Sequence, residues 1–239
     1  MSSYYCLVAG LPDVNLDDGK LNYTVENFKS ELYPELSRKD QLLIDLFYLK
    51  YDNADLLRLL KDKDAVVDGG GNFSSEELLA LITAVREGET PDSRYPLYMY
   101  QFVEQYFMLQ PEEQYRADDL LAGLYYAYAM QCGNSFIASW FEFNLNVNNI
   151  LAALTARKYK MDVPSVVVGA TDVCAQLRTS NARDFGLTEQ ITYFEQIMRI
   201  SEIDELVERE KKIDLLKWNW LEDEVFFHYF TIERIFVFL

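Results

Sequence analysis

The chain of 239 residues is acidic and rich in aromatic side chains, with a formal net charge of −17 and 15% Phe, Trp and Tyr. This charge argues against nucleic-acid binding, because phosphate contacts need clustered Lys and Arg side chains, and against docking on anionic lipid head groups. Half of the residues are hydrophobic, which suffices for a packed core and argues against disorder. A basic protein partner, or simple solubility, suits the charge better.

The predicted elements in chain order are helices joined by short breaks. Residues 2–8 suit a short strand or the first turn of a helix, and leucines spaced three and four apart then predict helices over 42–49 and 52–63. The glycine-rich residues 68–72 predict a flexible, solvated loop. Ser74 and Glu77 predict the capped start of the next helix. Further helices are predicted over residues 98–109, 118–131 and 135–158.

The second half of the chain continues the helical pattern. Residues 166–168 suit a short strand or a packed loop, and helices are predicted over 188–199, over 203–220 and from Glu222 onward. The fold class is therefore predicted to be all-α, a multi-helix protein of repeated helical units. The predicted ranges are 1–115, 116–200 and 201–239, the last being the start of a third unit that is truncated at the C-terminus.

Two predicted helices share a sequence pattern. Residues 51–63 align with residues 145–157, so that Asp52 matches Asn146 and Asp55 matches Asn149 at one constant offset. A structural repeat would explain the match. The alternative is that Asp or Asn near one helix end and a base near the other follow from the helix dipole alone.

No motif in the chain predicts catalysis or a cofactor. The sole histidine, His228, lies in an aromatic segment, which favours a structural role over a catalytic one. Cys6, Cys132 and Cys174 are too scattered for a zinc site and, with no signal peptide, suit reduced thiols in a cytoplasmic protein. We expect no catalytic, cofactor-binding or metal-binding residues. Paired acids such as Glu112 and Glu113 favour helix starts, although a carboxylate-based enzyme stays open as an alternative.

The C-terminal segment 226–239 is strongly apolar and ends without a helix stop signal. We expect it to be exposed or covered by a neighbouring molecule, with a final helix missing beyond Leu239. The residues predicted to form a partner interface are Phe226, Phe227, Phe230, Glu233, Phe236 and Phe238.

Several segments together resemble a known family. Residues 51–63 and 145–157 resemble the Asp-x-x-Asn-Leu…Lys/Arg helix that recurs in the C-type subunit of archaeal-type and V-type ATPases, the counterpart of the eukaryotic d-type subunit. Residues 207–218 and 230–238 are similar to two segments near the end of that protein. Residues 4–13, YYCLVAGLPD, and 214–220, DLLKWNW, resemble a bacterial domain-of-unknown-function family encoded beside V-type ATPase subunits.

This resemblance implies a funnel-shaped helical protein without an active site. It implies a coupling subunit that links the membrane rotor ring to the central stalk, with those two as its partners. The expected location is cytoplasmic, peripheral to the inner membrane through the ATPase complex and without direct membrane insertion. The alternative function is an acidic helical adaptor unrelated to ATPases.

Overall fold

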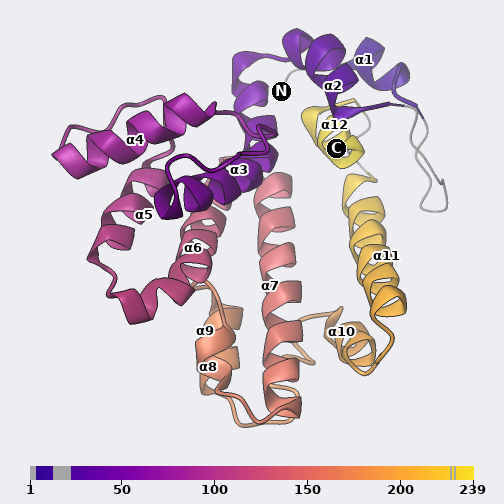
Figure 1. Ribbon diagram of the computed structural model, residues 1–239. Coiled ribbons are helices and arrows are strands. Elements are labelled where there is room, and N and C mark those ends of the chain that lie inside the picture. Colours follow the sequence, from indigo (N-terminus) through magenta and orange to yellow (C-terminus); the bar gives the residue numbers. More distant parts are fainter. Residues whose placement is uncertain (1–3, 13–22, 227, 229) are drawn as a thin grey trace. The chain divides into compact units, whose positions relative to one another are not determined.

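The computed structural model describes residues 4–12, 23–226, 228 and 230–239, and every regular element among them is a helix (Figure 1). The prediction of an all-helical protein is confirmed for these residues. Two compact units form: unit 1 takes residues up to Leu42, Asn134–Val167 and Thr171 onward, and unit 2 takes Leu43–Gly133 and Val168–Ala170. Neither unit coincides with the ranges 1–115, 116–200 and 201–239, which stay a prediction.

Helix α3 (Arg38–Lys61) is one continuous element. The prediction of separate helices over 42–49 and 52–63 was wrong, because neither Gly nor Pro interrupts the segment between them. Leu49, Asp52 and Asn53 lie on both sides of the expected break and are all buried, so the buried face of the helix is continuous there.

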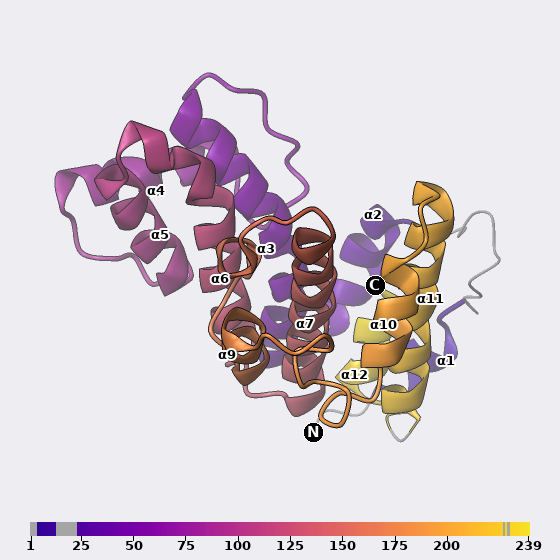
Figure 2. The same cartoon turned by 90° about the horizontal axis from the view of Figure 1, so that it is seen from below.

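Unit 2 packs α3 with α4 (Ser75–Glu87), α5 (Leu97–Met108) and α6 (Ala117–Ala129), which follows a 3-10 turn at Pro111–Arg116 (Figure 2). Two tyrosine hydroxyls join these helices to α3. Tyr98 donates to Asn53 Oδ1 at 2.7 Å, and Tyr125 donates to the Leu46 carbonyl at 2.8 Å. Burial raises the pKa of Tyr98 well above its usual value, so the hydroxyl keeps its proton for this bond.

Unit 1 is organised around α7 (Ser135–Lys158), whose bounds match the prediction. The helices α9 (Asp172–Thr179) and α10 (Phe194–Ser201) lie on opposite sides of α7 in both Figure 1 and Figure 2. The short α8 (Val163–Val166) precedes a loop, so residues 166–168 form no strand. The helix predicted from Thr188 begins only at Phe194, because residues 187–193 form hydrogen-bonded turns that bury Leu187 and Ile191.

The ends of unit 1 carry shorter elements: α1 (Tyr5–Ala9), α2 (Val25–Asn27), a π-helical turn at Phe28–Leu32 and a 3-10 turn at Tyr33–Glu35. At the other end, α11 (Leu206–Val225) precedes α12 (Ile232–Phe238). The predicted break near Glu222 is wrong. Helix α11 continues through Glu222 and ends at Val225, whose side chain is buried. None of the helices in the described ranges is long and apolar enough to cross a membrane.

Candidate functional site

Helix α12 has two chemically different faces. Glu233 and Phe236 are buried, together with Ile232 and Ile235. Arg234 and Phe238 lie four residues apart on the other face, where helical spacing brings them together, and both line a cavity. One helix therefore serves both the core and the surface.

The buried face of α12 packs on the start of α7. The Phe236 ring meets Phe136 edge-to-face, with 6.1 Å between ring centroids. Asn134 Nδ2 donates to Glu233 Oε1 at 2.7 Å, and Asn134 Oδ1 also accepts the Ile137 backbone N–H as the N-cap of α7. One asparagine thus holds the beginnings of both helices.

Glu233 is a buried carboxyl beside the one histidine of the sequence. Its Oε2 lies 3.7 Å from His228 Nδ1, an ion pair when the imidazole is protonated. Burial by itself would raise the pKa of Glu233, but hydrogen bonding, including the bond from Asn134, and the nearby imidazole lower that pKa overall. His228 also packs on the Phe136 ring at 5.5 Å. This geometry suits the predicted structural role for the histidine.

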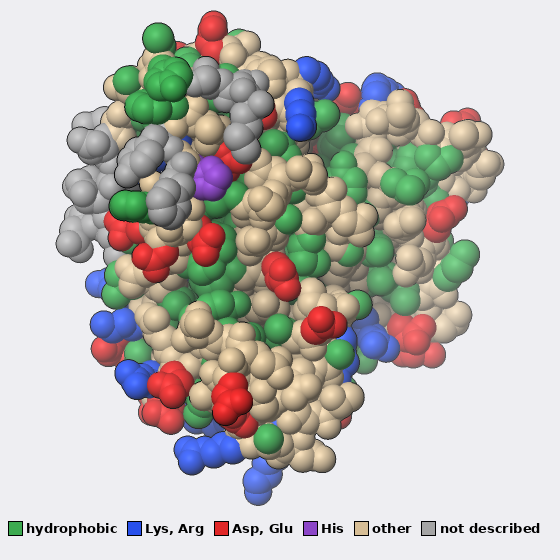
Figure 3. Space-filling view, turned by 180° about the vertical axis from the view of Figure 1, so that it is seen from behind, with side chains coloured by type: hydrophobic (Ala, Val, Ile, Leu, Met, Phe, Trp, Pro, Cys, Tyr) green, Lys and Arg blue, Asp and Glu red, His purple; other side chains and the backbone are tan. Residues whose placement is uncertain are grey.

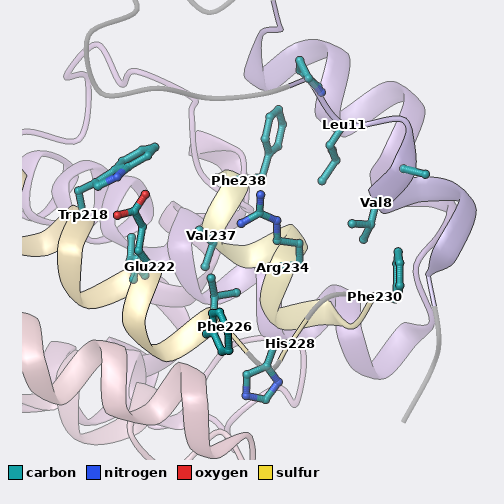
Figure 4. A pocket seen from close by; sticks show the side chains of 14 residues that line it. Val8, Leu11, Trp218, Glu222, Phe226, His228, Phe230, Arg234, Val237 and Phe238 are labelled. Atoms are coloured by element: carbon teal, nitrogen blue, oxygen red, sulfur yellow. The ribbon is translucent and has the colours of Figure 1, made fainter.

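The exposed face of α12 closes a cavity of about 520 Å³ with α1 and the last turns of α11. Figure 4 shows Arg234 between Phe238 and Leu11, with Glu222 beside Trp218 on the α11 side. The lining residues are mostly apolar: Val8, Ala9, Leu11, Pro12, Trp218, Leu221, Glu222, Val225, Phe226, His228, Phe230, Arg234, Val237 and Phe238. This volume falls within the range of about 300–1,000 Å³ typical of small-molecule sites.

Arg234 is the one Lys or Arg side chain among those lining residues. Within the described part of the chain, its guanidinium has no hydrogen-bond or ion-pair partner, and Glu222 in the same cavity has none either. Among the residues that the structure describes, the site therefore offers an unpaired cation beside apolar side chains.

The rim of the cavity is aromatic and accessible. Phe226 is 59% exposed and Phe230 is 39% exposed. The Phe230 ring lies 4.3 Å from the Tyr5 ring, and the Phe230 carbonyl accepts the Tyr4 backbone N–H at 2.8 Å. In Figure 3 the purple side chain of His228 reaches the surface beside a red acidic side chain, and green hydrophobic side chains lie below it. The exposed rings of Phe226 and Phe230 make the rim apolar. Such an apolar surface is typical of a binding face.

The six residues predicted as a partner interface divide between these surroundings. Phe226, Phe230 and Phe238 meet at the cavity. Glu233 and Phe236 are buried against α7, and Phe227 lies outside the described residues. The sequence analysis did not single out Arg234. Its four-residue spacing from Phe238 within the C-terminal helix was the available signal.

A second polar site lies in unit 2, where α3 holds the glycine-rich loop. Asp52 accepts the backbone N–H groups of Asn72 and Phe73 at 2.8 and 2.9 Å. Asp55 accepts those of Asp68 and Gly69 at 3.1 and 3.2 Å. The loop is solvent-exposed, as predicted, but two buried carboxylates of α3 bind its backbone, which argues against the predicted flexibility. These N–H groups are occupied, which leaves them unavailable to a phosphate.

The position of the Asp52 carboxylate also explains why residue 71 is a glycine. A Cβ at position 71 would overlap that carboxylate, so only Gly71 allows the loop to approach α3 so closely. Burial raises the pKa of Asp52 to about 6, although the bonds from Asn72 and Phe73 act in the opposite direction.

The matching positions on α7 carry amides in place of acids. Asn146 and Asn149 are buried, and Asn149 Nδ2 donates to Cys174 Sγ at 3.3 Å. Cys174 follows Thr171, which caps α9 through the Cys174 backbone N–H. The amide of α7 thus holds the start of α9, as the acids of α3 hold the loop before α4.

Acidic pairs elsewhere serve helix starts. Ser74 and Glu77 form the predicted capping box of α4, and Asp118 and Asp119 lie in the first turn of α6. In the described ranges no group of His, Cys, Asp and Glu side chains is arranged to hold a metal ion.

Comparison with known proteins identifies a family. The family described as "Protein of unknown function (DUF2764)" matches residues 1–239, so the chain belongs to it. No curated protein and no solved structure matches the chain.

Proposed function

We propose that this DUF2764 protein is a non-catalytic coupling subunit of a V-type ATPase, which links the membrane rotor ring to the central stalk. The proposal extends the resemblance of residues 51–63 and 145–157 to the recurring helix of the C-type ATPase subunit. It takes the funnel-like shape of that family as its expectation for the assembled protein.

The observation that carries the proposal is the shared use of α3 and α7. Asp55 and Asn149 occupy matching positions, are buried, and each binds a segment later in the chain. The helix dipole does not account for this pattern, because its influence falls off within the first turn. Asp52 and Asn146 lie well inside helices that begin at Arg38 and Ser135. A repeated structural unit is the better explanation of the sequence match.

The absence of an active site is part of the proposal. His228 contacts Glu233 and the Phe136 ring, an arrangement that stabilises α12. Among the described residues that line the cavity, the ionisable side chains are one arginine, one glutamate and this histidine. Such a set suits recognition, and a coupling subunit works through its contacts with neighbours.

The partner surface is proposed to include the aromatic rim of the cavity. Phe226 and Phe230 are exposed aromatic side chains on one edge of unit 1, and aromatic residues are enriched in protein interfaces. Through such contacts the protein would lie at the cytoplasmic face of the inner membrane without entering it.

The experiment is purification of the V-type ATPase from its own cells through a tag on one of its ATP-hydrolysing subunits. We expect the protein to co-purify in constant proportion with the stalk subunits and the rotor ring. Phe226→Asp should reduce this association, whereas Tyr115→Asp should not, although Tyr115 is a 79% exposed aromatic in unit 2. An intact, coupled ATPase lacking the protein, isolated from cells that express it, would refute the proposal.

A second candidate is an acidic adaptor with a basic partner, which the net charge of −17 favours. The same purification separates the two functions. An adaptor would be recovered with a basic protein at low salt and lost at high salt, because exposed charges are screened beyond about 10 Å at 0.1 M salt. ATPase subunits would be absent from that preparation.

A further inference from the structure

The cavity of unit 1 combines features that define a class of small ligand. Its volume is about 520 Å³, and its walls include Val8, Leu11, Val237 and Phe238. Small-molecule sites are mostly apolar, with a few polar groups that orient the ligand. A ligand with a hydrocarbon body matches these walls.

Arg234 supplies the orienting group. Figure 4 places its guanidinium inside the cavity, between Phe238 and Leu11, and no described side chain pairs with it. A guanidinium binds a planar carboxylate through two parallel hydrogen bonds. Arg234 itself is exposed to solvent, so the strength of this pair depends on its bidentate geometry.

Glu222 limits the charge that the cavity accepts. It lines the same cavity beside Trp218, on the α11 side, and would repel a second negative charge on the ligand. The net charge of −17 also repels polyanionic ligands. A single carboxylate at Arg234 is therefore favoured over a phosphate ester.

From these features we propose that the cavity between α1, α11 and α12 binds a free fatty acid of medium chain length. The carboxylate pairs with Arg234, and the acyl chain packs against Val8, Leu11, Val237 and Phe238. The net charge argues against docking on an anionic membrane surface. A single ionic contact with Arg234 depends on the immediate surroundings of that side chain, so the net charge does not prevent it. This binding activity is independent of the ATPase proposal, and either can fail without the other.

The test is calorimetric titration of the full chain with dodecanoate below its micelle concentration. We expect saturable binding with one ligand per chain. Dodecanol should bind at least tenfold more weakly, because it lacks the charge, and dodecylammonium should not compete. Each methylene removed from the acid should weaken binding about fourfold, which is the usual contribution of a buried CH₂.

His228 provides a second readout without labels at other sites. It lines the cavity and is the one histidine in the sequence, so tag-free protein gives a single set of imidazole NMR signals. Dodecanoate at constant pH should shift these signals along the calorimetric saturation curve. Saturable calorimetric heats without any change in these signals would place the acid elsewhere and overturn the proposal.

Arg234→Gln should weaken dodecanoate binding at least tenfold, and Arg234→Lys should retain part of the affinity because it keeps the charge. Arg199→Gln is the matched control, since Arg199 is an exposed arginine on α10 of the same unit, paired with Glu195. Circular dichroism melting would check that each variant is folded.

Three further results would overturn the proposal: no saturable binding of dodecanoate, equal affinity for dodecanol, or unchanged affinity in a folded Arg234→Gln variant. If dodecanoate does not bind and Phe230→Asp abolishes ATPase association, the cavity belongs to a protein partner. Loss of ATPase association alone would leave the titration result standing.

Discussion

Helices α3 and α7 hold later segments of the chain in the same way but through different chemical groups. Each helix has 24 residues and uses buried polar side chains to hold a segment that follows it. On α3, Asp52 and Asp55 accept backbone N–H groups from the glycine-rich loop. On α7, Asn149 donates to the side chain of Cys174.

The difference follows from donor and acceptor capacity. An ionised carboxylate only accepts hydrogen bonds, whereas an amide both donates and accepts. Acids therefore suit a loop that presents several N–H groups, and they can order a loop that has no regular structure. The amide site is less complete, because Asn146 Oδ1 has no hydrogen-bond partner among the described residues. The comparison teaches that matching positions on two helices can both hold a later segment, one by accepting backbone N–H groups and the other by donating to a side chain.

The most disruptive change should be Gly71→Ala. The new methyl group would overlap the Asp52 carboxylate and displace the bonds from Asn72 and Phe73. We expect a loss of about 4 kcal/mol in the free energy of unfolding, since bonds to charged acceptors contribute about 1.5–3 kcal/mol each. Urea denaturation measures it. Gly70→Ala is the control, because its methyl would make only an ordinary contact with Tyr51, and an equal loss there would contradict the explanation.

Exchanging the chemistry of the two helices gives the next largest effect. Asn149→Asp removes the donor to Cys174 Sγ and buries a charge, so we expect a loss of about 3 kcal/mol at neutral pH. The loss should shrink as the pH falls and the new acid takes up a proton. An Asn149→Asp protein as stable as the wild type at pH 7 would show that the α7 site accommodates a carboxylate as the α3 site does.

The acid of α3 should make unit 2 sensitive to pH. The pKa of Asp52 is raised from 3.8 to about 6, so the folded state binds this proton more tightly than the unfolded chain. Its contribution is fully present below pH about 4 and is lost as the pH rises through about 6, on the order of 2–3 kcal/mol. The difference in unfolding free energy between wild type and Asp52→Asn, followed from pH 4 to 8, isolates it. A difference between the two proteins that stays constant from pH 4 to 8 would contradict this prediction.

The smallest expected effects on the free energy of unfolding concern two arginines, Arg58 and Arg157. Arg58 bridges Asp55 and the exposed Asp68, so Arg58→Gln should cost little, and the cost should vanish at about 0.5 M salt. Arg157 donates to the carbonyls of Ser180 and Arg183, so Arg157→Gln should cost about 1–2 kcal/mol at any salt concentration. Urea denaturation at two salt concentrations tests both. A salt-dependent Arg157 effect would mean that charge, and not hydrogen bonding, governs that site.

Local signals predicted the elements that depend on neighbouring residues. The Ser74 and Glu77 capping box and the bounds of α7 were predicted correctly, because caps and periodicity act within a few residues. The hydrogen bonds that hold the glycine-rich loop were not predicted, since they come from Asp52 and Asp55 on a preceding helix. Of the residues that line the candidate cavity, the sequence analysis named Phe226, Phe230 and Phe238 but not Arg234.

By itself the sequence determined the helical class, the capped helix starts and the aromatic character of the C-terminal segment. These properties arise from side-chain spacing and from each residue's own backbone preferences. Only the tertiary structure decided which face of α12 is buried, that Arg234 stands in a cavity with Leu11, and that Gly71 lies against Asp52. Those outcomes depend on residues far apart in the chain, whose approach is set by the packing of whole helices.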